Sequence, residues 1–249
     1  MVECLRGIMR TGVVALGLLA VGKIGAETAF AAEPNASLRV GHYSTGDGMA
    51  GFVLDRLATP VKVRFDDSDE ILALTPEPAP LDSFNLMRDD GKAALRVYDN
   101  GQVLLFGDRA KNGSANAYRD KNAQPLTIKK ATKAQALAAA AALSQQLKRD
   151  AGVPIAVVLE APRLSDTSAN WAVLADAVTV TGIAVRDLLA TKLGKEAIAA
   201  KVKRIVIRPA GGIDIKFADG TLAVEVVADK PVLGRPSSLR LKSAMGDLL

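Results

Sequence analysis

The chain has 249 residues, of which 49% are hydrophobic and 4% aromatic, and its formal net charge is +5. This length suits one large domain or two small ones, and the apolar content is sufficient for a packed core. The positive charge is mild, and the basic clusters at 129–130 and 201–204 have no aromatic residues among them. Nucleic-acid-binding surfaces combine basic stripes with stacking rings, so we expect no nucleic-acid partner.

The first 31 residues have the pattern of a secretory signal peptide. Arg6 and Arg10 form a positive n-region, residues 11–22 form a short apolar h-region, and the small residues Ala29 and Ala31 suit signal peptidase. The apolar run is too short to span a bilayer, and no second apolar run follows it. We therefore predict cleavage after Ala31, a location in the periplasm or outside the cell, and no stable membrane anchor.

Cysteine and histidine are too few for most metal sites. Cys4 is the only cysteine and lies in the predicted leader, so the processed chain contains no thiol. This excludes disulfides, a cysteine nucleophile and thiolate-bound metals. His42 is the only histidine, which excludes a multi-histidine site, and no motif in the chain indicates a cofactor.

Residues 38–107 are predicted to be rich in strands. Short apolar runs alternate with turns, and Asn100-Gly101 is the strongest hairpin signal in the chain. We expect the prolines of TPEPAP (75–80) to break regular structure and residues 108–130 to form a polar connection. Five to seven strands at this spacing indicate an antiparallel sheet, a sandwich or a partial barrel. The predicted strands span 38–45, 51–58, 61–65, 70–75, 84–87, 93–99 and 103–107.

The composition changes after residue 130, where helices are predicted among further strands. Thr132 is a suitable N-cap for a helix rich in Ala and Leu, and Gly152 is a suitable end for it. Asp219-Gly220 indicates a hairpin between the last two strands. The predicted strands span 154–161, 204–208, 212–220 and 221–228, and a short strand or helix follows GRPSS (234–238).

A second helix is predicted to begin near Asp166 and to end at Gly194, with a short helix over 195–202. Its apolar positions recur at steps of three and four residues, as in a helix with one buried face. We expect this stripe to pack on the sheet formed by the C-terminal strands. Its members are Trp171, Leu174, Val178, Val185, Leu189 and Leu193.

These elements predict an α+β fold. An N-terminal antiparallel β-rich half is followed by α-β-α-β-β-β, packed on one mixed sheet. The expected organisation is a signal peptide over 1–31 and a single exported domain over 32–249. The linker composition leaves two arrangements open: one continuous core, or two subdomains over 36–108 and 131–249.

His42 is the only candidate for a histidine base. Ser44, Asp47 and Asp55 lie near it in sequence, but His42 sits within a predicted strand, and no G-x-S-x-G nucleophile motif is present. We favour a structural or solvent-facing histidine. Carboxylates that converge in space for hydrolysis stay open as well, although aromatic residues for a sugar platform are scarce.

The run Asp66-Asp67-Ser68-Asp69-Glu70 is the densest acidic cluster. Calcium prefers several oxygen ligands from a short loop, and Asp66, Asp67 and Asp69 are the candidate ligands here. The run lacks the glycine and the trailing glutamate of an EF-hand loop. A solvated turn whose Asp side chains bond their own backbone is the interpretation we favour.

The segment GRPSS (234–238) is the most unusual feature near the C-terminus. Arg235 and Ser237 are candidates to hold an anion if the serines cap a following helix, since a helix start presents free N–H groups. The alternative is an arginine bonded to a carboxylate, with Pro236 fixing a turn. We favour that alternative.

Three segments together resemble a family of exported alphaproteobacterial proteins that carries only a domain-of-unknown-function label. They are GHYSTGDGMAGFVLDRLATPVKVRFD (41–66), EILALTPEPAP (70–80) and GRPSSLRL (234–241). The resemblance implies export and one unit over nearly all of the processed chain. It implies no activity and no site residues.

Two classes of function are therefore compatible with the sequence. A noncatalytic exported protein that binds a ligand, an envelope component or a partner protein is favoured, because catalytic motifs are missing. The alternative is a periplasmic hydrolase that uses His42 or dispersed carboxylates. Convergence of His42 or two carboxylates in one deep pocket would favour the enzyme.

Overall fold

The computed structural model describes residues 40–161 and 164–248. These residues all fall within one compact unit. The predicted signal peptide over 1–31, including its cleavage site, lies outside the described residues. Within the described ranges, no helix is long and apolar enough to cross a membrane.

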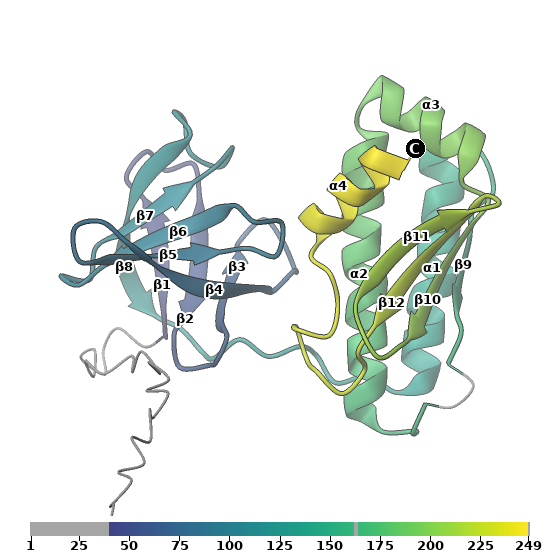
Figure 1. Cartoon of the computed structure of the whole chain (residues 1–249), viewed down its shortest axis with the longest axis horizontal. Helices are drawn as coiled ribbons and strands as arrows, with labels where there is room; N and C mark the ends of the chain where they lie inside the picture. The colour runs from purple at the N-terminus through teal and green to yellow at the C-terminus, as the bar shows by residue number, and fades with distance from the viewer. Residues whose placement is uncertain (1–39, 162–163, 249) are drawn as a thin grey trace, which may run out of the picture. The chain divides into compact units, whose positions relative to one another are not determined.

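Eight antiparallel strands form a closed barrel in the N-terminal half of the chain (Figure 1). Each strand pairs with its neighbour in sequence, and β1 closes the barrel by pairing with β8. Asn100-Gly101 forms a turn between two strands, as predicted. The strands are β1 (Val40–Thr45), β2 (Gly51–Asp55), β3 (Val61–Phe65), β4 (Leu72–Ala79), β5 (Ser83–Met87), β6 (Ala93–Tyr98), β7 (Val103–Phe106) and β8 (Ser114–Asn122).

Two predictions for this half were wrong. The expected polar connection contains β8, whose residues are mostly exposed, so the strand carries little of the apolar alternation that would reveal it. The prolines do not break β4 either: Pro76 and Pro78 pair with residues of β5. Since β3 pairs with β4 only from Leu72 to Leu74, the prolines fit the edge of β4 where no ladder N–H is needed.

Apolar side chains that point inward fill the barrel. Tyr43 and Phe52 stack with ring centroids 5.5 Å apart, and Phe65 packs against Phe52 at 5.7 Å. The barrel therefore has a packed core of its own, and its polar groups gather at the ends of strands and in the turns. Further buried members of this core are Leu54, Val63, Leu74, Leu86, Leu95, Val97, Val103 and Leu105.

The C-terminal half is a four-stranded mixed sheet with helices. The strand order is β11-β12-β10-β9, in which β11 is antiparallel to β12 and the other neighbours are parallel. α1 and α2 pack against each other and lie behind the sheet in the view of Figure 1. The elements are α1 (Lys133–Ala151), β9 (Ala156–Leu159), α2 (Ser168–Leu189), α3 (Lys192–Lys201), β10 (Arg204–Pro209), β11 (Asp214–Ala218), β12 (Thr221–Val226) and α4 (Ser238–Leu248).

The fold is α+β, as predicted, and the predicted order of helices and strands in the C-terminal half is confirmed. The C-terminal strands form one mixed sheet, as predicted. The N-terminal strands, for which a sheet, a sandwich and a partial barrel were open, form a complete barrel. The eight N-terminal strands close on themselves, so none of them pairs with β9 to β12. A barrel that closes in this way satisfies its strand edges internally and offers little edge to a second sheet.

The helix starts follow the sequence closely. Thr132 and Gln135 form a capping box at α1, which ends at Gly152 in the left-handed region (φ 77°). α2 begins after Thr167, but it ends at Leu189 instead of Gly194. Thr191 caps the next helix by accepting from the Gly194 N–H, so this glycine lies in the first turn of α3.

The predicted stripe of α2 belongs to the main core of the C-terminal half. Trp171, Leu174, Val178 and Val185 are buried, and Leu189 is partly buried against the same core. Buried side chains of β10 and β12, including Ile205, Ile207, Leu222 and Val224, are members of this core as well. The face of α2 is therefore predicted correctly from its spacing up to Leu189, but Leu193 was predicted wrongly, because it lies in α3 and is exposed.

Candidate functional site

The acidic turn between β3 and β4 sends its carboxylates to different partners. Asp66 contacts His42, Asp67 contacts Arg109, and Glu70 is buried on the other side of the turn. Because the carboxylates diverge, they do not form a common cage. In the described part of the chain, no group of three or more acidic, histidine or cysteine residues is arranged to hold a metal ion.

His42 on β1 lies between two carboxylates. Its Nδ1 is 2.8 Å from Asp120, and its Nε2 is 2.8 Å from Asp66. The hydroxyl of Ser44 donates to Asp120 at 2.7 Å. The approach of Asp66 requires Gly51, since a Cβ there would collide with the Asp66 carboxylate.

This geometry favours the imidazolium form of His42. Ionised carboxylates only accept hydrogen bonds, so both ring nitrogens have to donate, which the imidazolium alone can do. Desolvation is the largest single effect and lowers the pKa of His42, but hydrogen bonds and charge attraction from Asp66 and Asp120 outweigh it and raise the pKa. The Ser44 hydrogen bond is the largest cause that lowers the pKa of Asp120.

The cluster therefore lacks the arrangement of an activated serine. A histidine that acts as a general base needs a free nitrogen lone pair that faces the nucleophile. Here both nitrogens of His42 face carboxylates, and the Ser44 hydroxyl bonds to Asp120 instead of the ring. The geometry orders a turn and a strand, and it does not prepare Ser44 for attack.

Asp47 and Asp55 bond to backbone groups instead of His42. Asp47 accepts from the N–H groups of Met49 at 3.0 Å and Lys111 at 3.1 Å. Asp55 is 1% exposed and accepts from the N–H of Leu126 at 2.8 Å and from a second N–H nearby. Both carboxylates therefore hold loops in place.

Arg235 lies at the centre of a buried charge cluster. Its Nε donates to Asp176 on α2 at 2.5 Å, a terminal nitrogen donates to the Ile71 carbonyl at 2.9 Å, and another lies 3.4 Å from Glu70. Glu70 also accepts from the N–H and hydroxyl of Ser238. Burial raises the pKa of Glu70, and Arg235 and Ser238 oppose that rise.

The start of α4 binds carboxylates of this same chain. The Ser237 N–H donates to Asp89 at 2.8 Å, and its hydroxyl donates to the other oxygen of that carboxylate at 2.5 Å. Glu70 occupies the Ser238 N–H next to it. The sequence predicted N–H groups at this helix start that have no partner within the helix. In the structure they donate to the carboxylates of Asp89 and Glu70.

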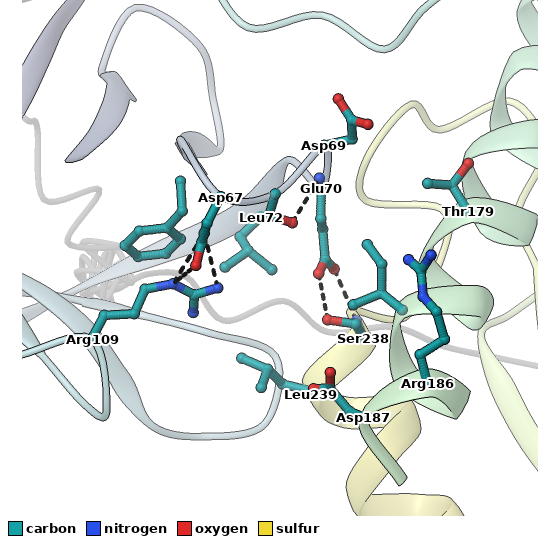
Figure 2. A pocket seen from close by; sticks show the side chains of 13 residues that line it. Asp67, Asp69, Glu70, Leu72, Arg109, Thr179, Arg186, Asp187, Ser238 and Leu239 are labelled. Atoms are coloured by element: carbon teal, nitrogen blue, oxygen red, sulfur yellow. Dashed lines mark hydrogen bonds and ion pairs between the residues drawn. The ribbon is translucent and has the colours of Figure 1, made fainter. Parts of the chain in front are cut away.

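A cavity of about 410 Å³ lies beside this cluster (Figure 2). The acidic turn supplies Asp67, Asp69 and Glu70, and α2 supplies Thr179 and Arg186. Its volume is within the range of small-molecule sites. The cavity combines charged side chains with apolar ones, and the rest of the lining is Phe65, Ser68, Leu72, Arg109, Ile183, Asp187, Ser238 and Leu239.

A family model described as "Domain of unknown function (DUF4908)" matches residues 25–245. The chain belongs to the DUF4908 family. No curated protein and no solved structure matches it. The resemblance found in the sequence is thus confirmed at the level of a domain of unknown function, and the DUF4908 match extends over both the barrel and the mixed sheet.

The sequence did not predict several residues of these two charge clusters. Asp120 lies on β8, which was predicted to be a connection, so its approach to His42 was not foreseen. Asp176 and Glu70 were not expected to share Arg235, because they are 106 positions apart. One signal was present: Glu70 directly precedes the apolar run of β4, which places it close to the core.

Proposed function

We propose that this protein is a noncatalytic ligand-binding protein that acts in the periplasm or outside the cell after loss of its leader. The observation that carries the binding proposal is the cavity of about 410 Å³ with charged and apolar walls. Small-molecule sites commonly combine an apolar surface with a few polar groups that fix orientation. The pattern of residues 1–31 supports the exported location.

The arrangement of the polar groups supports binding over catalysis. The single histidine is held by two carboxylates, and the nearest hydroxyl donates to one of them. No hydroxyl therefore faces a free nitrogen of His42 in that cluster. The bound molecule is a small ligand, an envelope component or a partner protein.

A ligand screen on the protein as cells produce it tests the binding proposal. A ligand that binds the folded state raises the apparent melting temperature by mass action. We expect stabilisation by one class among inorganic ions, sugars, amino acids, short peptides and envelope fragments. The absence of stabilisation by every class, together with unchanged stability in a crude envelope extract, would contradict it.

The exported location has its own test. N-terminal sequencing of the protein from a periplasmic fraction should begin at Ala32, because the small residues at 29 and 31 suit the peptidase. A protein that begins at Met1 and stays with the cytoplasmic fraction would sink this part of the proposal without affecting the binding part.

A periplasmic hydrolase is the second candidate, and one observation favours it. An open hollow of about 810 Å³ lies beside the cluster of His42, Asp66 and Asp120. A substrate bound there would be able to displace a carboxylate from the His42 ring and free one of its nitrogens. We expect His42→Gln to leave any measurable hydrolytic activity largely intact. A loss of several orders of magnitude in a folded variant would favour the hydrolase, with Ser44 the next position to replace.

A further inference from the structure

Two charged side chains of the cavity have no partner. Within the described residues, Asp69 and Arg186 form no hydrogen bond or ion pair through their side chains, and Figure 2 shows both without a dashed line. The other carboxylates of the lining are occupied: Asp67 by an arginine at 3.2 Å, Asp187 by a lysine at 3.5 Å, and Glu70 by Ser238. The cavity thus presents one free charge of each sign.

The two free groups come from different elements. Asp69 lies on the acidic turn between β3 and β4, and Arg186 lies in the last turn of α2. Residues 179, 183 and 186 of α2 all line the cavity, as expected for neighbours on one helix face. Both residues are exposed and do not pair with each other, so both charges are available to a ligand.

Apolar side chains complete the lining. Phe65, Leu72, Ile183 and Leu239 all contribute to it. The guanidinium of Arg109 lies 4.3 Å from the centre of the Phe65 ring while it pairs with Asp67. This arginine is therefore already occupied on two sides, and Arg186 is left as the cation for a ligand.

We infer that this cavity binds a small zwitterion, an α-amino acid or a short peptide with an apolar side chain. Its ammonium group pairs with Asp69, and its carboxylate pairs with Arg186. A planar guanidinium binds a carboxylate through two parallel hydrogen bonds, which gives both strength and orientation. The inference rests on the proposed binding function and names the class of its ligand.

Simple ions fit this lining less well. An anion without an ammonium group meets four carboxylates against two guanidinium groups in the lining, and it leaves Asp69 unpaired. A simple cation leaves Arg186 unpaired. A single ligand with both charges pairs with the two free groups together, and its apolar side chain gains from the surfaces of Ile183 and Leu239.

Calorimetric titration with L-leucine and with the dipeptide Ala-Leu tests the inference. We expect saturable binding of at least one of them. N-acetyl-leucine lacks the ammonium and leucinamide lacks the carboxylate, so each should bind about tenfold or more weakly than leucine. Asp69→Asn and Arg186→Gln should weaken binding by a similar factor, while Arg186→Lys should retain part of it.

Matched controls are Asp229→Asn and Arg149→Gln, which change exposed residues outside the cavity lining. They should bind as the unchanged protein does. Equal binding of the blocked and free ligands, or unaltered binding by the two cavity variants, would overturn the zwitterion. Thermal melting confirms that each variant is folded.

The failure of the inference is distinguishable from failure of the proposed function. If leucine and Ala-Leu do not bind but another class stabilises the protein, and Ile183→Trp abolishes that stabilisation, the zwitterion is wrong and the binding function stands. If no class of the screen binds, both are wrong. Binding of leucine that Ile183→Trp leaves unchanged would place it elsewhere and overturn the inference.

Discussion

The acidic turn contributes to two charge clusters that differ in their exposure to water. At one end of the turn, Asp66 joins His42 and Asp120, and the side chains of the two carboxylates are 53% and 41% exposed. At the other end, Glu70 and Arg235 have side chains that are only 6% and 2% exposed. Asp66 and Glu70, two carboxylates four positions apart, therefore lie in two different dielectric environments.

Burial determines how much a charge pair affects the free energy of unfolding. In exposed pairs, water and salt screen the attraction, and the net gain is small. In buried pairs, each charge has lost its hydration, so removal of one partner leaves the other uncompensated. The two clusters of this turn allow that contrast to be measured within one protein.

The largest effect is expected at Arg235. Arg235→Met leaves Glu70 and Asp176 without their cation, and the free energy of unfolding should fall by about 3–5 kcal/mol. Urea denaturation measures the change. The matched control is Arg109→Met, which removes an exposed pair from the same turn and should cost less than about 1 kcal/mol. Equal losses of unfolding free energy in the two variants would contradict the expected difference between the buried and the exposed cluster.

Truncation of a buried apolar side chain gives a reference value for these changes in unfolding free energy. Leu174 is fully buried in the core of the C-terminal half, so Leu174→Ala should cost about 2–5 kcal/mol in unfolding free energy. A value near zero would show that this stripe of α2 does not pack as described. The same urea experiment provides the measurement.

Glu70 should give a pH dependence with a defined sign. Burial raises the pKa of Glu70 above its ordinary 4.5, so the folded state holds this proton more tightly than the unfolded state. Its contribution is most favourable below pH 4.5 and weakens as the pH rises through the folded-state pKa. The stability of the unchanged protein relative to Glu70→Gln should therefore decline on going from acidic to neutral pH. A difference that rises with pH would contradict the direction.

The smallest effect is expected at His42. Its pKa is raised above 6.5, so the stabilising imidazolium is fully present below pH 6.5 and is lost as the pH rises through the folded-state pKa. Because its partners are partly exposed, we expect less than about 1 kcal/mol of unfolding free energy. Stability measured across pH 6 to 9 should flatten in His42→Gln, and an unchanged slope would exclude His42 as its source.

Local patterns predicted much of the fold. The cap at Thr132, the helix start near Asp166, the glycine at 152 and the buried stripe of α2 are set by residues close together in sequence, and each is observed. The hairpin at Asp219-Gly220 is likewise a local feature, and its strands pair as predicted. Such features follow from backbone sterics and hydrogen bonding within a few residues.

The site was harder to predict from the sequence because its interacting residues are distant from each other along the chain. His42 and Asp120 are 78 positions apart, and Glu70 and Ser238 are 168 apart. Barrel closure by β1 and β8 creates the first pair, and no short pattern encodes that closure. In the acidic run, only the position of Glu70 directly before the apolar residues of β4 indicates burial, and nothing local indicates which partner Glu70 would contact.

The two prolines of β4 affect whether a strand of another molecule can pair with this edge. Past Leu74, β4 pairs with β5 alone among the described strands, so its other edge is open to strand addition from a neighbouring chain. Intermolecular addition of this kind begins many aggregation processes, and it depends on a regular row of N–H donors. Pro76 and Pro78 remove donors from that row. At high protein concentration, this stretch of β4 is therefore a poor template for another strand.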